Sequence, residues 1–138
     1  MIDQRVNELI KMGNDYREKK RYELSQEYYL TSVNLLFNLK NIFESTIQDN
    51  LKIKNNKYIK KNYLSLSNIL YKISDGYRAA AQVGMNIAMK KSMAQIGKPS
   101  YSQSSTEKNI YDFSTKYIEQ SEKFYQSAKS YEDNSKKL

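Results

Sequence analysis

Five lysines gather near the middle of the chain, in a segment that also contains Tyr58 and is followed by Tyr63. They are Lys52, Lys54, Lys57, Lys60 and Lys61. Ammonium groups attract phosphates and aromatic rings stack on exposed bases, so this segment predicts a nucleic-acid-binding surface. Base-specific contacts favour arginine over lysine, however, and a solvated lysine-rich loop without any ligand is the alternative interpretation.

Small residues recur at every fourth position between residues 76 and 92, which places them in a line along one helix. They are Gly76, Ala80, Gly84, Ala88 and Ser92. Such a line lets another helix approach closely, and the neighbouring Met85, Met89 and Met93 would suit an adaptable apolar contact. We expect the line to pack inside the chain or to accept a partner helix or a second copy of the protein. The predicted partner-binding residues are Gly76, Ala80, Gly84, Met85, Ala88 and Met89.

The inventory of catalytic side chains is poor, because the chain contains neither histidine nor cysteine. The commonest general base, the commonest metal ligand and the thiolate nucleophile are therefore missing. Carboxylates such as Asp3, Glu8 and Asp15 lie at ion-pairing distances from basic residues on polar helix faces. The glycines have neither the spacing of a phosphate-binding loop nor that of a dinucleotide fingerprint. We predict a protein that is not an enzyme and that uses no cofactor and no metal.

The positive charge is concentrated in the middle of the chain. The net charge is +8, yet basic and acidic residues balance within residues 1–47 and again within residues 101–138, so the whole excess lies in residues 48–100. A basic zone of this kind attracts phosphates, anionic lipid surfaces or acidic protein segments.

Length and composition predict one helical domain that covers residues 1–138. A chain of 138 residues has room for one core, and 39% hydrophobic residues with 13 Tyr can fill it. Four Gly and one Pro are too few for a protein of many short strands and turns. The fold class is therefore all-α.

Apolar residues at spacings of three and four predict the helices of an antiparallel bundle. The first ends near the basic run 19–21, and the second covers residues 22–47 as the other arm of a hairpin. Residues 48–61 show no sustained period and are interpreted as a loop, with a short helical piece as the alternative. The third helix covers residues 62–96 and stops before Gly97 and Pro99.

Two features decide how many helices the bundle has and where the last one begins. The bundle has four helices, or five if residues 74–76, which end in Gly76, interrupt the third. Ser104 and Glu107 form the pattern of a capping box, so the last helix begins there, and its tail after Glu132 is expected to fray.

The N-terminal hairpin resembles the tetratricopeptide repeat over residues 9–33. The resemblance maps the first-helix positions onto Leu9, Met12, Gly13 and Tyr16, and the second-helix positions onto Ser25, Tyr29 and Ser32, with Tyr22 at the turn. The hairpin is about as similar to the microtubule-interacting and transport domain, whose helices grip partner helices. Either resemblance implies a repeat-like hairpin in a module that binds other proteins.

No targeting or membrane-spanning segment is evident. The first 20 residues carry charges throughout, and the most apolar run, residues 78–89, is too short to cross a bilayer. We expect a cytoplasmic protein without a membrane span. The leading functional hypothesis is a non-catalytic protein-interaction module, an adaptor or assembly subunit, and the alternative is nucleic-acid binding through residues 48–100.

Overall fold

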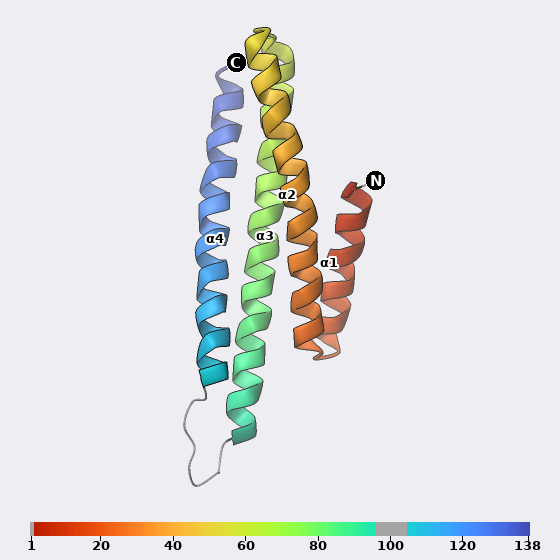
Figure 1. Cartoon of the computed structure of the whole chain (residues 1–138), viewed down its shortest axis with the longest axis vertical. Helices are drawn as coiled ribbons and strands as arrows, with labels where there is room; N and C mark the ends of the chain where they lie inside the picture. Colours follow the sequence, from red (N-terminus) through yellow and green to blue (C-terminus); the bar gives the residue numbers. More distant parts are fainter. Residues whose placement is uncertain (1, 96–104) are drawn as a thin grey trace.

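The computed structural model describes residues 2–95 and 105–138, which form four helices and no strand. The helices are α1 (Ile2–Glu18), α2 (Tyr22–Lys52), α3 (Asn56–Gln95) and α4 (Ser105–Lys136). The long helices α2, α3 and α4 run antiparallel side by side, and α1 covers only the lower half of α2 (Figure 1). The predicted all-α antiparallel bundle is therefore confirmed. Gly97, Pro99 and Ser104, on which two boundary predictions depended, lie outside the described residues.

The two short turns are closed by the same pattern of backbone hydrogen bonds. At the α1–α2 turn the Arg21 amide donates to the Tyr16 carbonyl, and at the α2–α3 turn the Asn55 amide donates to the Asn50 carbonyl. Each bond closes a Schellman motif, whose left-handed position is usually glycine. Lys20 and Lys54 occupy that position here, with φ of 61° and 53°.

The expected loop over residues 48–61 was wrong, and of the two helix counts left open the structure has four. Residues 48–61 are helical except for the turn at residues 53–55, because buried Ile47 and Ile59 hold both helix ends in the core. The third helix is not interrupted at Gly76, since that glycine lies buried at a close helix contact. The last helix continues past Glu132 to Lys136.

Helices α3 and α4 approach through small residues that recur every seventh position on both. They are Ser67, Ser74 and Ala81 on α3 and Ser114, Ser121, Ala128 and Ser135 on α4, and all are buried. Ser67 Oγ donates to the Ala128 carbonyl at 2.7 Å, and Ser74 and Ser121 donate to each other's carbonyls at 2.8 and 2.9 Å. A seven-residue repeat keeps one seam in contact along an antiparallel pair of helices. The seam therefore holds α3 and α4 together by close packing and by hydroxyl-to-backbone bonds.

An aromatic cluster joins α2 to the α3–α4 pair. Phe37 on α2 packs edge-on against Phe124 on α4, with ring centroids 5.3 Å apart. Tyr77 on α3 stacks on Phe124 and on Tyr117. Aromatic pairs contribute about 0.5–1.5 kcal/mol beyond the area they bury, so this cluster fixes how the three long helices lie against one another.

The α1–α2 hairpin is tight because small residues meet at its centre. Ser25 Oγ donates to the Gly13 carbonyl at 2.7 Å, and a Cβ atom on Gly13 would lie 2.6 Å from the buried ring of Tyr29. This is the close approach expected from the small residues of the hairpin. Its assignment to a repeat family stays a prediction.

Two serines one heptad apart on α4 give a matched test of the seam. Ser121 Oγ is hydrogen-bonded to α3, whereas buried Ser114 Oγ has no partner among the described residues. We expect Ser121→Ala to lower the free energy of unfolding by about 1 kcal/mol and Ser114→Ala to leave it equal or raise it by about 1 kcal/mol, because an unpaired buried hydroxyl is destabilising. Urea denaturation followed by circular dichroism measures both. An equal loss in the two variants would contradict this account of the seam.

Candidate functional site

The line of small residues on α3 is occupied by the chain's own helices. Gly76 and Ala80 are buried, and a Cβ atom on Gly76 would lie 2.5 Å from Val33 Cγ2 of α2. Gly84 faces Ser114 of α4 and Gln26 of α2, and Ala88 is half-buried. The groove expected beside these residues is filled, so a partner helix would have to displace α2 or α4 to reach them.

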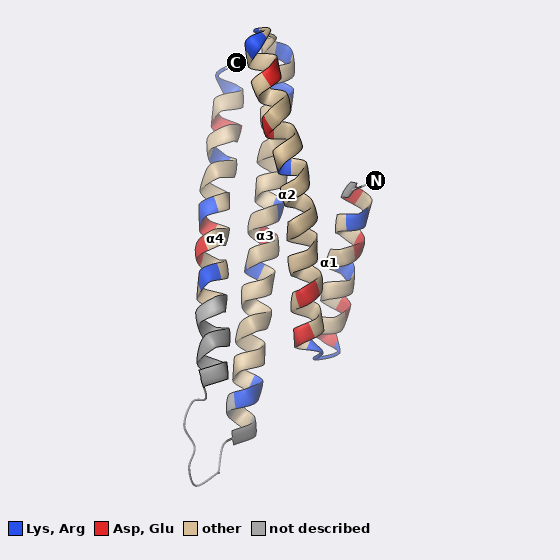
Figure 2. Ribbon diagram, in the orientation of Figure 1, with Lys and Arg blue, Asp and Glu red and all other residues tan. Residues whose placement is uncertain are grey.

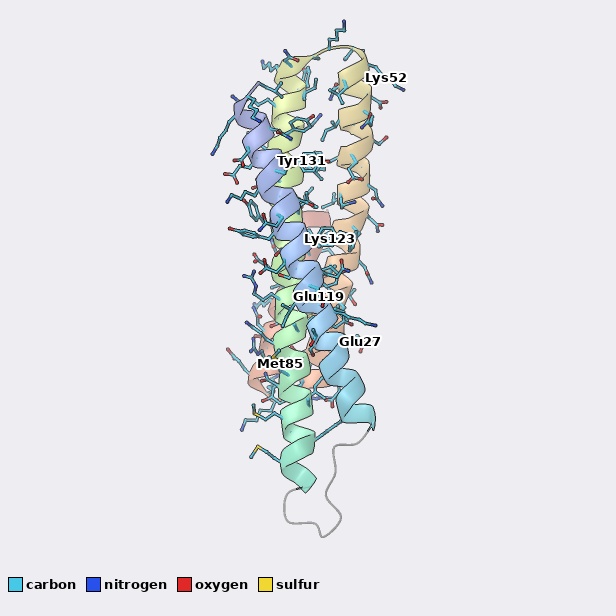
Figure 3. All side chains as sticks on the ribbon, turned by 90° about the vertical axis from the view of Figure 1, so that its left-hand side faces the viewer. Glu27, Lys52, Met85, Glu119, Lys123 and Tyr131 are labelled. Atoms are coloured by element: carbon cyan, nitrogen blue, oxygen red, sulfur yellow. The ribbon has the colours of Figure 1, made fainter. Side chains whose placement is uncertain are left out.

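The methionines beside that line face solvent. Met85, Met89 and Met93 lie one helical turn apart on α3, and the exposed fractions of Met89 and Met93 are 62% and 64%. We call these three residues the methionine row. Met85 lies toward one end of the bundle, and Lys52 marks the other (Figure 3). Of the six residues predicted to bind a partner, Met85 and Met89 are the two that the structure leaves exposed.

A shallow hollow adjoins the methionine row at the α1–α2 turn. Its volume is about 360 Å³, and it is lined by Lys20, Tyr22, Asn86, Met89, Lys90 and Met93. Lys20 and Lys90 also line a neighbouring hollow with Arg21, Glu23 and Leu24. The site therefore combines adaptable apolar side chains with an edge of ammonium groups.

The predicted nucleic-acid-binding residues lie at the opposite end, where α2 turns into α3. We call residues 51–61 the lysine tip. Lys52, Lys54, Lys57, Tyr58, Lys60 and Lys61 are all exposed there, and the carboxyl end of α4 adds Lys136 and Lys137 on the same side (Figure 2). The basic zone of residues 48–100 is therefore not one surface. From Lys61 to Lys90 the straight helix α3 extends roughly 44 Å at 1.5 Å per residue, with exposed Lys72 and Arg78 in between, so the positive charge is spread along the length of the bundle.

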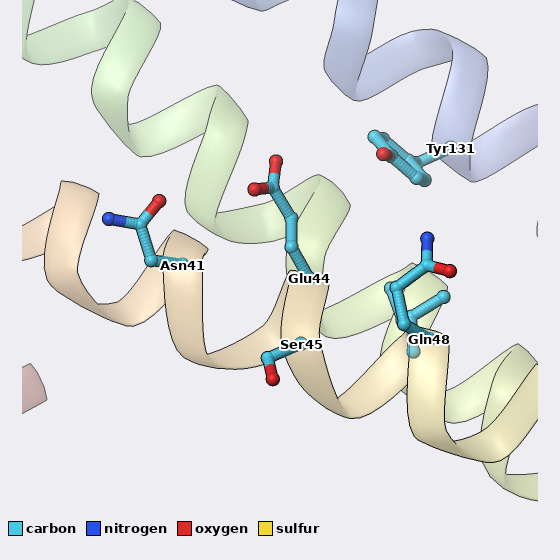
Figure 4. A pocket seen from close by; sticks show the side chains of 6 residues that line it. Asn41, Glu44, Ser45, Gln48 and Tyr131 are labelled. Carbon is cyan, nitrogen blue, oxygen red and sulfur yellow. The ribbon is translucent and has the colours of Figure 1, made fainter.

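A third hollow, of about 390 Å³, opens between α2 and α4 (Figure 4). Its lining is mostly polar and consists of Asn41, Glu44, Ser45, Ile47, Gln48 and Tyr131. The Glu44 carboxylate lies 2.9 Å from Lys40 Nζ. Burial raises the pKa of Tyr131, and the Glu44 carboxylate raises it further. A phenol held protonated beside an ion-paired carboxylate is a poor acid–base pair at neutral pH.

Tyrosine hydroxyls along the α3–α4 contact also have raised pKa values. The hydrogen bond that Tyr71 donates to Glu132 at 2.8 Å, together with burial, raises the pKa of Tyr71 to about 12. Burial raises the pKa of Tyr77 and of Tyr117. These shifts favour the neutral phenols, and the Tyr71 hydroxyl acts as a structural donor in the contact.

In comparisons with models of protein families, with curated proteins and with solved structures, no match to this chain was found. Within residues 2–95 and 105–138, no group of three or more His, Cys, Asp and Glu side chains is placed to hold a metal ion. Among the helices of these residues, we also find none that has the length and hydropathy of a membrane-spanning helix.

Sequence reasoning missed two features that the structure brings together. The seven-residue repeat of small residues in residues 67–81 and 114–135 was present in the sequence, but only the four-residue line was recognised. The exposed Leu51 and Ile53 of the lysine tip were hidden by its interpretation as a loop. The sequence signal for these exposed side chains is the alternation of aliphatic residues with lysines over residues 51–54.

Gly76→Ala tests whether the small-residue line is a close helix contact. Alanine in an exposed helix stabilises by about 1 kcal/mol relative to glycine. At Gly76 the new methyl group would overlap Val33 Cγ2, so we expect the free energy of unfolding to fall by about 1–3 kcal/mol instead. Urea denaturation measures the change. In a Val33→Ala background, Gly76→Ala should lower the free energy of unfolding by less. If the losses of the two single variants simply add in the double variant, the contact is refuted.

The Tyr71–Glu132 hydrogen bond predicts a loss of stability at alkaline pH. The folded protein holds the Tyr71 proton more tightly than the unfolded chain, in which the pKa of Tyr71 is 10.0. The hydrogen bond therefore contributes fully to the free energy of unfolding below pH 10, and this contribution is lost as pH rises toward 12. We expect Tyr71→Phe to be less stable than wild type at about pH 9, with a difference that shrinks toward about pH 12. Glu132→Gln should flatten the wild-type profile, and a constant difference in urea midpoint would contradict this role.

Proposed function

We propose that the protein is a non-catalytic interaction module, an adaptor or assembly subunit, that binds a helical segment of another protein along the methionine row. The observation that carries the proposal is the exposure of Met85, Met89 and Met93, three flexible apolar side chains in one line on α3. Contiguous exposed apolar side chains mark interaction surfaces in soluble proteins. Thioether side chains adapt to partners of different shape.

The surroundings of the row define the chemistry of the partner. Lys20 and Lys90 border the hollow beside Met89 and Met93, and they would pair with carboxylates at the edge of a bound helix. A helix that docks in a groove presents apolar residues at spacings of three, four and seven. We therefore infer that the partner segment is an amphipathic helix with acidic residues beside its apolar face.

The resemblance of residues 9–33 to protein-binding helical hairpins supports the same class of function. The hairpin also helps build the site, because its turn contributes Lys20 and its second helix contributes Tyr22 to the hollow. The proposal places the protein in the cytoplasm, with a protein partner in place of a substrate or cofactor. Self-association along the row is the competing arrangement, and the oligomeric state tests it directly.

The nucleic-acid alternative has less support. Its basic residues are spread along the length of α3, so a single strand at the lysine tip would meet five of them, together with Lys136 and Lys137 of α4. Tyr63, one of the two rings expected to stack on bases, packs instead against Tyr131 with centroids 5.5 Å apart. Tyr58 alone stays free to stack at the tip.

The experiment compares wild type with the double variant Met89→Asp, Met93→Asp. Both positions are exposed, so the substitutions should preserve the fold while removing the apolar surface and repelling an acidic partner. We expect proteins retained from a host lysate by wild type to be lost, and a purified partner to bind at least roughly tenfold more weakly in titration calorimetry.

Ile42→Asp is the matched control, because Ile42 is an exposed apolar residue on α2 away from the row. It should retain the same partner. A partner lost equally with Ile42→Asp, or retained by the double variant, would refute the proposal. Sedimentation that shows a wild-type dimer dissociated by the double variant would assign the row to self-association instead.

A further inference from the structure

The apex of the α2–α3 turn exposes aliphatic side chains to water. Ile53 lies in the turn itself with 68% of its surface exposed, the largest value among the big apolar side chains of the described residues. Leu51 and Tyr58, on either side of the turn, are 43% and 53% exposed. The helices beneath are anchored, since Ile47 and Ile59 are buried. The turn between two anchored helices therefore exposes an apolar apex.

Lysines without an ion-pair partner among the described residues surround that apex. Lys52, Lys54 and Lys57 flank Ile53 within one helical turn on each side, and all three are exposed. The ion pairs formed by the described residues, Arg5–Glu8, Lys40–Glu44 and Lys136–Glu132, involve none of these three lysines. Asp49 is the acidic residue of residues 48–61. The tip is therefore both basic and apolar.

This combination distinguishes between two anionic ligands. A phosphodiester backbone uses the lysines, but it offers nothing to an isoleucine and a leucine at the apex. A bilayer with anionic lipids uses both, because ammonium groups attract the headgroups while aliphatic side chains enter the acyl boundary. The described helices do not span a membrane, so the contact is a peripheral one.

We propose that the lysine tip is a docking site for anionic lipid bilayers, in which Ile53 inserts between headgroups that contact Lys52, Lys54 and Lys57. The bundle then projects from the membrane on its long axis, with the methionine row at the far end. This site is independent of the function proposed above, and either can fail without the other.

The experiment measures co-sedimentation of the protein with vesicles of phosphatidylcholine mixed with phosphatidylglycerol. We expect binding that falls with added salt, and no binding to vesicles of pure phosphatidylcholine. The triple variant Lys52→Gln, Lys54→Gly, Lys57→Gln should bind about a hundredfold more weakly. Glycine at position 54 suits the left-handed backbone there, so a loss of binding cannot come from unfolding of the turn.

Two variants at Ile53 and one control variant test insertion. Ile53→Asn should weaken binding at least roughly tenfold, whereas Ile42→Asn on the side of α2 should not. The chain has no tryptophan, so Ile53→Trp supplies a single indole whose emission should shift to the blue on mixed vesicles. Vesicle binding that depends on lipid charge, but that gives no blue shift and is not weakened by Ile53→Asn, would overturn insertion.

A single-stranded oligonucleotide, measured by fluorescence anisotropy, is the competing ligand. Oligonucleotide binding that the lysine triple variant abolishes, together with no vesicle binding by wild type, would overturn the proposal in favour of nucleic acid. Equal binding to both vesicle compositions would also overturn it. The lysine pair Lys90→Gln, Lys91→Gln at the opposite end is the charge control and should leave vesicle binding unchanged.

Discussion

The close approach of α3 and α4 governs how the whole bundle is packed. Serine and alanine at every seventh position let the two backbones approach, and serine hydroxyls donate to carbonyls of the opposite helix. Only small side chains permit this distance, and a bulky residue at any of the positions would separate the helices. Because α4 covers one side of α3 along most of its length, the remaining sides of α3 contact α2 or face solvent.

The core that results is unusually rich in hydroxyl groups. Ser25, Ser32, Ser67, Ser74, Ser121 and Ser135 are buried, and each donates to a backbone carbonyl. Tyrosines line the α3–α4 contact and hold their protons more tightly than free phenols. Polar groups can be buried at little cost when they are paired, so this composition is compatible with a stable bundle.

The length of α3 separates the two surfaces that we propose to act. The methionine row and its lysine border lie at the end formed by the α1–α2 turn, and the lysine tip lies at the end formed by the α2–α3 turn (Figures 2 and 3). Roughly 44 Å of straight helix lies between the basic residues of the two ends. A protein bound at one end and a lipid surface at the other would not compete for space, as an adaptor requires.

Local periodicity and composition were enough to predict the all-α class, the antiparallel arrangement, the end of α1 and the start of α2. The helical state of most of residues 48–61 depends instead on packing, since buried Ile47 and Ile59 stabilise helix ends that the lysines and asparagines of this segment do not predict. The same is true of the candidate sites. Helical spacing placed Gly76, Ala80 and Gly84 in one line, but which neighbours cover that line depends on the packing of α2 and α4. Continuity along the chain predicted one basic zone, and a helix of 40 residues spreads it along the bundle, because distance along a rigid helix becomes distance in space.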